Sequence, residues 1–277
     1  MNQIIINNYS KIKALLFLIP LVLLSIITLF LYFENCLSIN GYVRIQKSTF
    51  LFINHFVGGY PTLLFNLTQV GDALVFTSFI SILFVYCPKL WESLITGSLF
   101  SLLFTAVLKN FFAVPRPAAM FDNHTFNIIG ERLAASNSFP SGHSITVFTF
   151  ITVLMFAFMP KQLKYRIGFY IFAILIGLLF AFTRVAVGAH YPLDVIVGCL
   201  VGYICGLLGT LISKKYEIWT WIYKRKYYPL FLVLFIICSI LLVQRIMERG
   251  LIIHYLSLIS LIITLYKITS VYVEKRD

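Results

Sequence analysis

Charged residues are scarce in this chain of 277 residues, where Asp, Glu, Lys and Arg together make up 12%. A soluble domain carries about twice that fraction, so the composition excludes a soluble domain. Hydrophobic residues make up 60% instead, and they gather in runs that suit membrane-spanning helices better than barrel strands. We therefore expect an all-α protein that forms a polytopic bundle of membrane helices.

Cysteine is sparse as well, and it is dispersed along the chain. The spacing of the five cysteines matches neither a disulfide framework nor a metal site. Most of them fall inside apolar runs, which predicts small hydrophobic residues of the core. The five are Cys36, Cys87, Cys199, Cys205 and Cys238.

Eight apolar runs are candidate membrane spans. The seventh has only 14 residues, so it is either a span or a helix lying at the interface. Asn35–Phe56 mixes apolar with polar residues, which favours an interfacial amphipathic helix over a span. The eight runs are Ala14–Phe33, Pro61–Cys87, Trp91–Phe112, His143–Met159, Ile167–Thr183, Leu193–Ile212, Leu230–Val243 and Leu251–Ile268.

Three short polar segments interrupt this apolar chain. They are Lys109–Pro117, Phe139–His143 and Arg184–Asp194. A cation at the end of a span is costly unless it is paired or solvated, so Lys109, Arg116 and Arg184 are functional candidates. Snorkelling to the interface is the structural alternative for any one of them. Three cations close to two histidines favour a bound anion, because Arg offers phosphate a two-pronged contact and Lys adds a point charge.

Ser141-Gly142-His143 directly precedes an apolar helical run. Ser is a good N-cap, and Gly lets the backbone approach a ligand closely. The free N–H groups at such a helix start attract anions. The alternative is an ordinary helix cap with an incidental histidine.

The segment from His190 to Asp194 has the spacing of an oriented nucleophile. Pro192 suits the first position of a helix, so the sixth run begins just after His190. Asp194 follows four residues later, where its carboxylate can accept one ring N–H and leave the other nitrogen free to attack. An Asp that merely stabilises its own helix start is the alternative, and it leaves His190 unexplained. Two histidines in one pocket suggest opposite protonation states, one attacking and one releasing the leaving oxygen.

The net charge of +12 comes from 22 Lys and Arg against 10 Asp and Glu. In a membrane protein this excess indicates topology and not a nucleic-acid partner, because basic residues collect on the cytoplasmic side. With a cytoplasmic N-terminus and eight spans, 14 basic residues fall inside and eight fall outside. Three of the outer eight are Lys109, Arg116 and Arg184. This topology places all three polar segments on the outer side.

The motifs Lys109-x6-Arg116-Pro117, Pro140–His143 and Arg184-x5-His190-x3-Asp194 resemble the three-part signature of the type 2 phosphatidic acid phosphatase superfamily, also called lipid phosphate phosphatases. The resemblance covers roughly Pro61–Ile212. Thr183 departs from the family, which often has Ser before the Arg, but Thr keeps the hydroxyl group.

The resemblance also implies a division of the chain. Residues 1–213 would form a membrane phosphatase core of six spans. Residues 214–277 would add a basic connector and two further apolar helices.

By this resemblance, His190 would be the nucleophile and form a phosphohistidine, with Asp194 orienting its ring. His143 would be the general acid for the leaving group. The family needs no metal or other cofactor, which agrees with a chain that offers cations at the site and no acidic cluster. The residues expected to hold phosphate oxygens are Lys109, Arg116, Ser141, Gly142 and Arg184.

Lesser candidates surround these residues. Asp72 lies within the second apolar run, where it is expected to pair with a cation of the polar segments or to sit near the interface. Pro117 and Pro140 are expected to support their motifs. Glu131 and Arg132 either shape the entrance or are solvated loop charges. The remaining histidines, which have no partner pattern, are His55, His124 and His254.

The sequence therefore predicts an enzyme that removes a phosphate or diphosphate group from a lipid at the outer leaflet. Richness in Ile, Phe and Lys, without eukaryotic sorting signals, favours a bacterial inner membrane with the site facing the periplasm. Candidate substrates are undecaprenyl diphosphate, phosphatidylglycerol phosphate, phosphatidic acid and lipid A phosphate. Two alternatives stay open: a phosphotransferase with a lipid or sugar acceptor, and a lipid transporter without catalysis.

Overall fold

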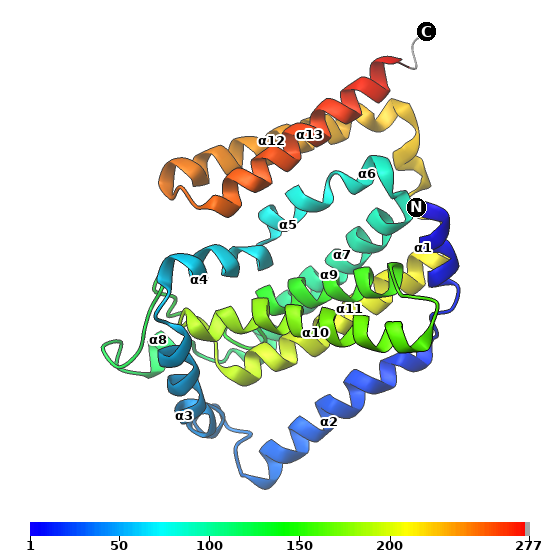
Figure 1. The fold of residues 1–277 in the computed structure, drawn as a ribbon. Coiled ribbons are helices and arrows are strands. Elements are labelled where there is room, and N and C mark those ends of the chain that lie inside the picture. Colours follow the sequence, from blue (N-terminus) through cyan, green and yellow to red (C-terminus); the bar gives the residue numbers. More distant parts are fainter. Residues whose placement is uncertain (275–277) are drawn as a thin grey trace.

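The computed structural model describes residues 1–274, and Figure 1 shows their arrangement. No strand occurs among these residues, so the all-α prediction is confirmed. Lys275 and Arg276, which the charge count placed on the cytoplasmic side, lie outside the described residues. The helices are α1 (Asn2–Tyr9), α2 (Leu18–Phe33), α3 (Ile39–Val57), α4 (Pro61–Thr68), α5 (Ala73–Ile80), α6 (Leu83–Tyr86), α7 (Pro88–Phe112), α8 (Pro117–Met120), α9 (Gly142–Ala157), α10 (Leu163–Ala186), α11 (Pro192–Lys215), α12 (Tyr228–Glu248) and α13 (Ile252–Glu274).

Within residues 1–274, six helical stretches are long and apolar enough to cross a membrane. These are the stretches of α2, α7, α10, α11, α12 and α13, and they make this a multi-pass membrane protein. The 14-residue run Leu230–Val243 belongs to the 21-residue helix α12, which is long enough to cross a membrane. The other two predicted spans, the second and the fourth, differ from a regular span.

The second predicted span is broken in the middle. Its two halves, Pro61–Gly71 and Ala73–Tyr86, meet at an angle of 67°. At the break, Asp72 caps the next helix, because its Oδ1 accepts the backbone N–H groups of Leu74 (2.9 Å) and Val75 (3.3 Å). A cap residue has non-helical backbone, so the predicted second span, Pro61–Cys87, is not one continuous helix.

The fourth predicted span is short. Helix α9 has 16 residues, which corresponds to about 24 Å, whereas the hydrocarbon core is about 30 Å thick. It packs against α7, α10 and α11, so it lies within the bundle. Its start, with Ser141 as N-cap, is therefore surrounded by the ends of longer helices.

Helix α11 approaches α9 closely because it presents glycine at every fourth position. A Cβ added at Gly202 would lie 2.4 Å from the carbonyl oxygen of Ile145 on α9. Gly198 and Gly206 face Ser141 and Thr149 in the same way. Small residues are what allow membrane helices to approach this closely. The close contact places the third polar segment beside the second.

Helix α3 runs across the ends of its neighbours instead of alongside them (Figure 1). It contacts α10 and α11. Tyr42, Gln46, Phe50 and Asn54 are buried at intervals of four residues, so one stripe of the helix faces the bundle. The predicted amphipathic helix is confirmed, whereas its place at the membrane interface stays a prediction.

The last two helices form an antiparallel pair, coloured orange and red in Figure 1. Both α12 and α13 pack against α5, the second half of the broken span. The described chain ends lie at one end of the bundle in Figure 1, and the α12–α13 turn lies at the opposite end, on the side of α3 and α8. The starts of α9 and α11 and the end of α10 lie at that opposite end too, so the three polar segments share one end of the bundle.

Candidate active site

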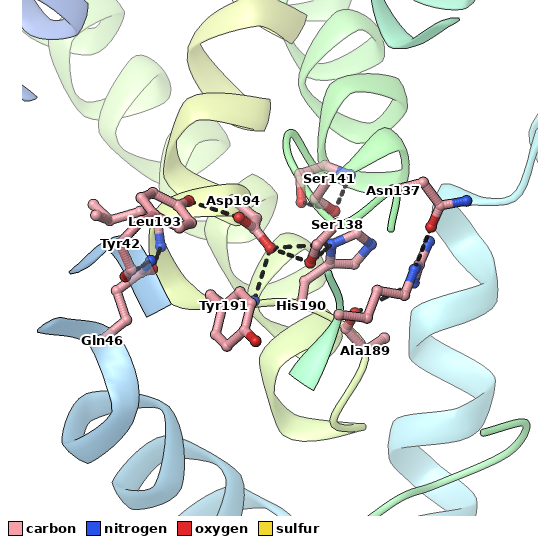
Figure 2. A network of polar contacts seen from close by, with 12 residues as sticks. Tyr42, Gln46, Asn137, Ser138, Ser141, Ala189, His190, Tyr191, Leu193 and Asp194 are labelled. Atoms are coloured by element: carbon pink, nitrogen blue, oxygen red, sulfur yellow. Dashed lines mark hydrogen bonds and ion pairs between the residues drawn. The ribbon is translucent and has the colours of Figure 1, made fainter. Parts of the chain in front are cut away.

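The carboxylate of Asp194 is the centre of a buried polar network (Figure 2). It lies in the first turn of α11, and none of its surface is exposed. Its Oδ1 accepts the hydroxyl of Tyr42 at 2.6 Å. Its Oδ2 accepts the Ser138 hydroxyl at 2.5 Å and the backbone N–H of Tyr191 at 3.0 Å. These bonds fix the carboxylate in a single orientation toward His190.

His190 sits in the turn between α10 and α11. Its backbone N–H donates to the carbonyl of Arg184 at 3.2 Å. The turn requires Gly188, whose φ is +79° and whose added Cβ would lie 2.6 Å from the carbonyl oxygen of Asn127. The ring Nδ1 lies 3.4 Å from both Asp194 Oδ2 and Ser138 Oγ. This is long for a hydrogen bond, and catalytic hydrogen bonds often tighten only when substrate binds.

Burial lowers the pKa of His190 well below its usual value, and the nearby charges of Arg116, Arg184 and Lys109 lower it further. The histidine is 1% exposed. Since protonation would add a positive charge among three cations, the ring stays neutral. A neutral imidazole with one nitrogen directed at Asp194 has the other nitrogen available for attack.

The three predicted cations come together around His190. The ammonium of Lys109 interacts electrostatically with both guanidinium groups. Arg184 Nη1 donates to the Thr68 hydroxyl at 2.8 Å, while its buried Nε has no partner among the described residues. Arg116 Nε donates to Asn137 Oδ1 at 2.7 Å. Each guanidinium is therefore anchored on one side and keeps further N–H groups for a ligand.

Ser141 and Gly142 form the start of α9 as expected. Ser141 Oγ accepts the backbone N–H of Ser144 at 3.4 Å and its hydroxyl at 2.9 Å. The backbone N–H of Ser141 donates to the Asp194 carbonyl at 3.0 Å, which ties the second polar segment to the third. A Cβ at Gly142 would lie 3.8 Å from Lys109 Nζ, so this helix start faces the cation.

His143 occupies the next position of α9 and is partly exposed. It makes no hydrogen bond with another described residue, and it lines a pocket of about 300 Å³ together with Arg184. Gly71, at the break of the second span, packs on its backbone, where an added Cβ would lie 2.8 Å from His143 Cβ. The broken span therefore positions the second histidine.

The lesser candidates have mixed outcomes. Asp72 pairs with Arg245 at 2.9 Å and not with a cation of the three polar segments, so that part of the prediction is wrong. Glu131 pairs with Arg249 at 3.4 Å and lines the same pocket as His143, which agrees with a place at the entrance. Pro117 begins α8, and Pro140 directly precedes the Ser141 cap. The latter two have no contact that sets them apart as site residues.

Sequence reasoning missed the side chains that hold the predicted residues in place. The sequence predicts Tyr42 only as part of an amphipathic helix, whereas Tyr42 and Gln46 belong to the buried stripe of α3. Gln46 Oε1 accepts the backbone N–H of Leu193 at 2.7 Å. Ser138 lies two residues before the Pro140–His143 motif. Its position beside that motif was the one sequence signal that could have identified a supporting residue.

The side chains at the site that could bind a ligand are mainly cationic. Within residues 1–274, no three His, Cys, Asp or Glu side chains are grouped in a way that could hold a metal ion. What these residues offer to a phosphate is Lys and Arg side chains and a helix start. The prediction of a metal-free reaction stays a prediction.

An apolar pocket of about 510 Å³ lies on another side of the network. Its lining comes from α2, α7 and α11, and it reaches Tyr42 and Phe139 beside Asp194. A lipid chain is the kind of group that such a lining would accept.

Comparison with known proteins gives one family and several relatives. The PAP2 superfamily profile matches residues 90–218. Lipid A 1-phosphatase of Rhizobium etli is 35% identical over 154 residues, covering 55% of this chain and 63% of that protein. Undecaprenyl-diphosphatase of Sulfolobus acidocaldarius is 29% identical over 150 residues, covering 53% of this chain and 68% of that protein.

A crystal structure of Aquifex aeolicus LpxE resembles the fold, with a TM-score of 0.50 and 28% identity. The likeness covers 62% of this chain and 96% of that one. A second lipid A 1-phosphatase, from Rhizobium johnstonii, is 34% identical. The chain spans 63% and 60% of the two Rhizobium proteins, which is less than two thirds of their length.

Proposed function

From the PAP2 superfamily domain that residues 90–218 form, we infer that this protein is a lipid phosphatase that works through a phosphohistidine and without a metal ion. The inference is supported by relatives named lipid A 1-phosphatase and undecaprenyl-diphosphatase. We place the catalytic core in residues 1–213, and residues 214–277 add the α12–α13 pair.

In the first step, the free ring nitrogen of His190 attacks the phosphorus atom of the substrate. The N–P bond forms as the bond between phosphorus and the lipid oxygen breaks. Protonated His143 gives its proton to that oxygen, so the lipid leaves as a neutral alcohol or, from a diphosphate, as a monophosphate. Asp194 accepts the Nδ1–H of His190 and stabilises the positive charge that develops on its ring.

In the second step, water hydrolyses the phosphohistidine. His143, now neutral, takes a proton from the water as its oxygen attacks phosphorus. The N–P bond breaks, and inorganic phosphate leaves. Lys109, Arg116 and Arg184 hold the phosphoryl oxygens in both steps and stabilise the additional charge of each transition state.

A lipid substrate is supported by the position of the site. The reacting residues lie at helix ends, where a headgroup would sit while its chains stay in the bilayer. The apolar pocket beside Phe139 suits such a chain. We propose that the N-terminus is cytoplasmic and that the site faces the periplasm of a bacterial inner membrane, because basic residues are enriched at the opposite end.

The single observation that carries this proposal is the fixed Asp194 carboxylate beside a buried, neutral His190 among three cations. The test is release of inorganic phosphate from purified lipid phosphates by detergent-solubilised protein. We expect turnover that survives EDTA and that is lost in His190→Ala, with the variant still inserted in membranes. Retained turnover in His190→Ala contradicts the nucleophile assignment, and a strict need for a divalent ion contradicts the metal-free mechanism. A phosphorylated acceptor in place of free phosphate indicates a phosphotransferase.

A further inference from the structure

The α12–α13 pair, which lies outside residues 90–218, contacts the broken span on both sides of its break (Figure 1). Three hydrogen bonds link α13 to the two halves. They join the Ile253 N–H to Asn66 Oδ1 (3.2 Å), Ser260 Oγ to the Ser78 carbonyl (3.0 Å), and the buried hydroxyl groups of Ser81 and Thr264 (2.9 Å). Asn66 precedes the break, whereas Ser78 and Ser81 follow it. Helix α13 therefore ties the two halves to each other.

Helix α12 adds an ion pair at the break itself. Arg245 Nη1 lies 2.9 Å from Asp72 Oδ1. The same carboxylate oxygen accepts the backbone N–H groups of Leu74 and Val75, which begin α5. Asp72 thus joins α5 to α12 at the residue where the span bends.

The residue before Asp72 is in contact with the proposed general acid. Gly71 packs on the backbone of His143, where an added Cβ would lie 2.8 Å from its Cβ and 2.9 Å from its carbonyl oxygen. This contact leaves no room for the break to move toward α9. A general acid must reach the leaving oxygen within hydrogen-bond distance, and a displacement of about 1 Å can cost about 100-fold in rate.

We propose that the α12–α13 pair positions His143 for proton transfer. Arg245 holds Asp72, Asp72 fixes the break, and Gly71 fixes the backbone of His143. Arg245 and Asp72 are therefore positioning residues that act through the general acid. This inference rests on the proposed phosphatase function, and it gives the part of the chain after the matched residues a role in catalysis.

The test compares kcat and KM for two probes, para-nitrophenyl phosphate and a long-chain alkyl phosphate. Arg245→Gln should lower kcat for the alkyl phosphate by about tenfold and that for para-nitrophenyl phosphate by less than about twofold, because nitrophenolate leaves without a proton. Arg245→Lys keeps a cation at this position and should recover most of the lost rate. Arg166→Gln is the matched control, because its guanidinium donates to the carbonyls of Pro160 and Lys161 near the start of α10, at the other end from Arg184.

Asp72→Ser separates positioning from a direct effect of the Arg245 charge. Ser is as good an N-cap as Asp, so α5 keeps its start, but its short side chain does not replace the ion pair. Two residues that act as one unit are not additive, so Asp72→Ser, Arg245→Gln and the double variant should lose similar amounts of alkyl phosphate turnover. If Arg245 acts alone, on the substrate or on the charge of His143, Asp72→Ser should not reproduce the loss.

Three results overturn the inference: equal losses on the two probes, alkyl phosphate turnover in Arg245→Gln that matches Arg166→Gln, and an Asp72→Ser variant that keeps wild-type turnover. In each case, hydrolysis of para-nitrophenyl phosphate by the wild-type protein shows that the phosphatase function itself stands. Wild-type protein that is inactive on both probes contradicts the proposed function, and the positioning inference fails with it.

Discussion

Tyr42 lies 152 positions before Asp194 in the chain, yet its hydroxyl is the one group that donates to Oδ1 of that carboxylate within the described structure. Replacing Tyr42 by Phe removes this hydrogen bond and keeps the ring, which packs edge-on against Phe139 and Tyr191. The substitution therefore probes how far helix α3 supports catalysis from outside residues 90–218, which match the PAP2 superfamily.

The expected cost follows from the nature of the bond. A hydrogen bond to a charged group contributes about 1.5–3 kcal/mol, and each 1.36 kcal/mol changes a rate by about tenfold. In the proposed mechanism, Asp194 stabilises the charge on His190 as it attacks, so much of this energy acts in the transition state. We expect kcat to fall by about 10- to 100-fold, with a smaller change in KM.

The assay is initial-rate phosphate release at saturating lipid phosphate, together with the thermal unfolding temperature of the purified protein. Tyr203→Phe is the matched control, because Tyr203 lies on the same helix as Asp194 and its hydroxyl makes no hydrogen bond with another described residue. If Tyr42→Phe keeps kcat within twofold of this control, the hydrogen bond from Tyr42 to Asp194 does not support catalysis.

Three further predictions follow from the geometry. His143→Gln should reduce hydrolysis of an alkyl phosphate by about 10²- to 10⁴-fold and that of para-nitrophenyl phosphate far less, because nitrophenolate leaves without a proton; equal losses would contradict the general-acid role. Gly202→Ala should lower the unfolding temperature, because overpacking costs about 1–3 kcal/mol, whereas Gly168→Ala, with no atom within 4 Å of an added Cβ, should not. Since the pKa of His190 is lowered, its protonation should reduce kcat/KM only below pH 6.5; a loss assigned to His190 above that pH would show that the ring is not held neutral.

The residues proposed to bind the phosphate could be predicted because their chemistry is local. Lys109, Arg116 and Arg184 are cations at the ends of apolar runs. A charge there costs free energy unless it is paired or solvated, so it indicates a functional role. His190 and Asp194 are one helical turn apart, so their contact follows from helix geometry. The structure brings all of these together with Ser141 and His143.

The supporting residues could not be predicted because their partners are distant in sequence. Tyr42 contacts Asp194 because α3 crosses the ends of α10 and α11 in the folded protein. The apolar run around Asp72 predicts a residue within a span, whereas its cap to α5 breaks that span and its partner, Arg245, comes from α12. Composition shows that a run is apolar, but it does not show where a single carboxylate will end a helix.

Trapping of the covalent intermediate tests the central claim most directly. A lipid phosphate labelled with radioactive phosphorus is mixed with the protein, quenched within milliseconds in base, and the labelled peptide is identified by mass spectrometry. We expect a phosphoryl group on the ring of His190, labile in acid, and no label in His190→Ala. Label on a different residue, or turnover by an active protein that never becomes labelled, would contradict a phosphohistidine mechanism at His190.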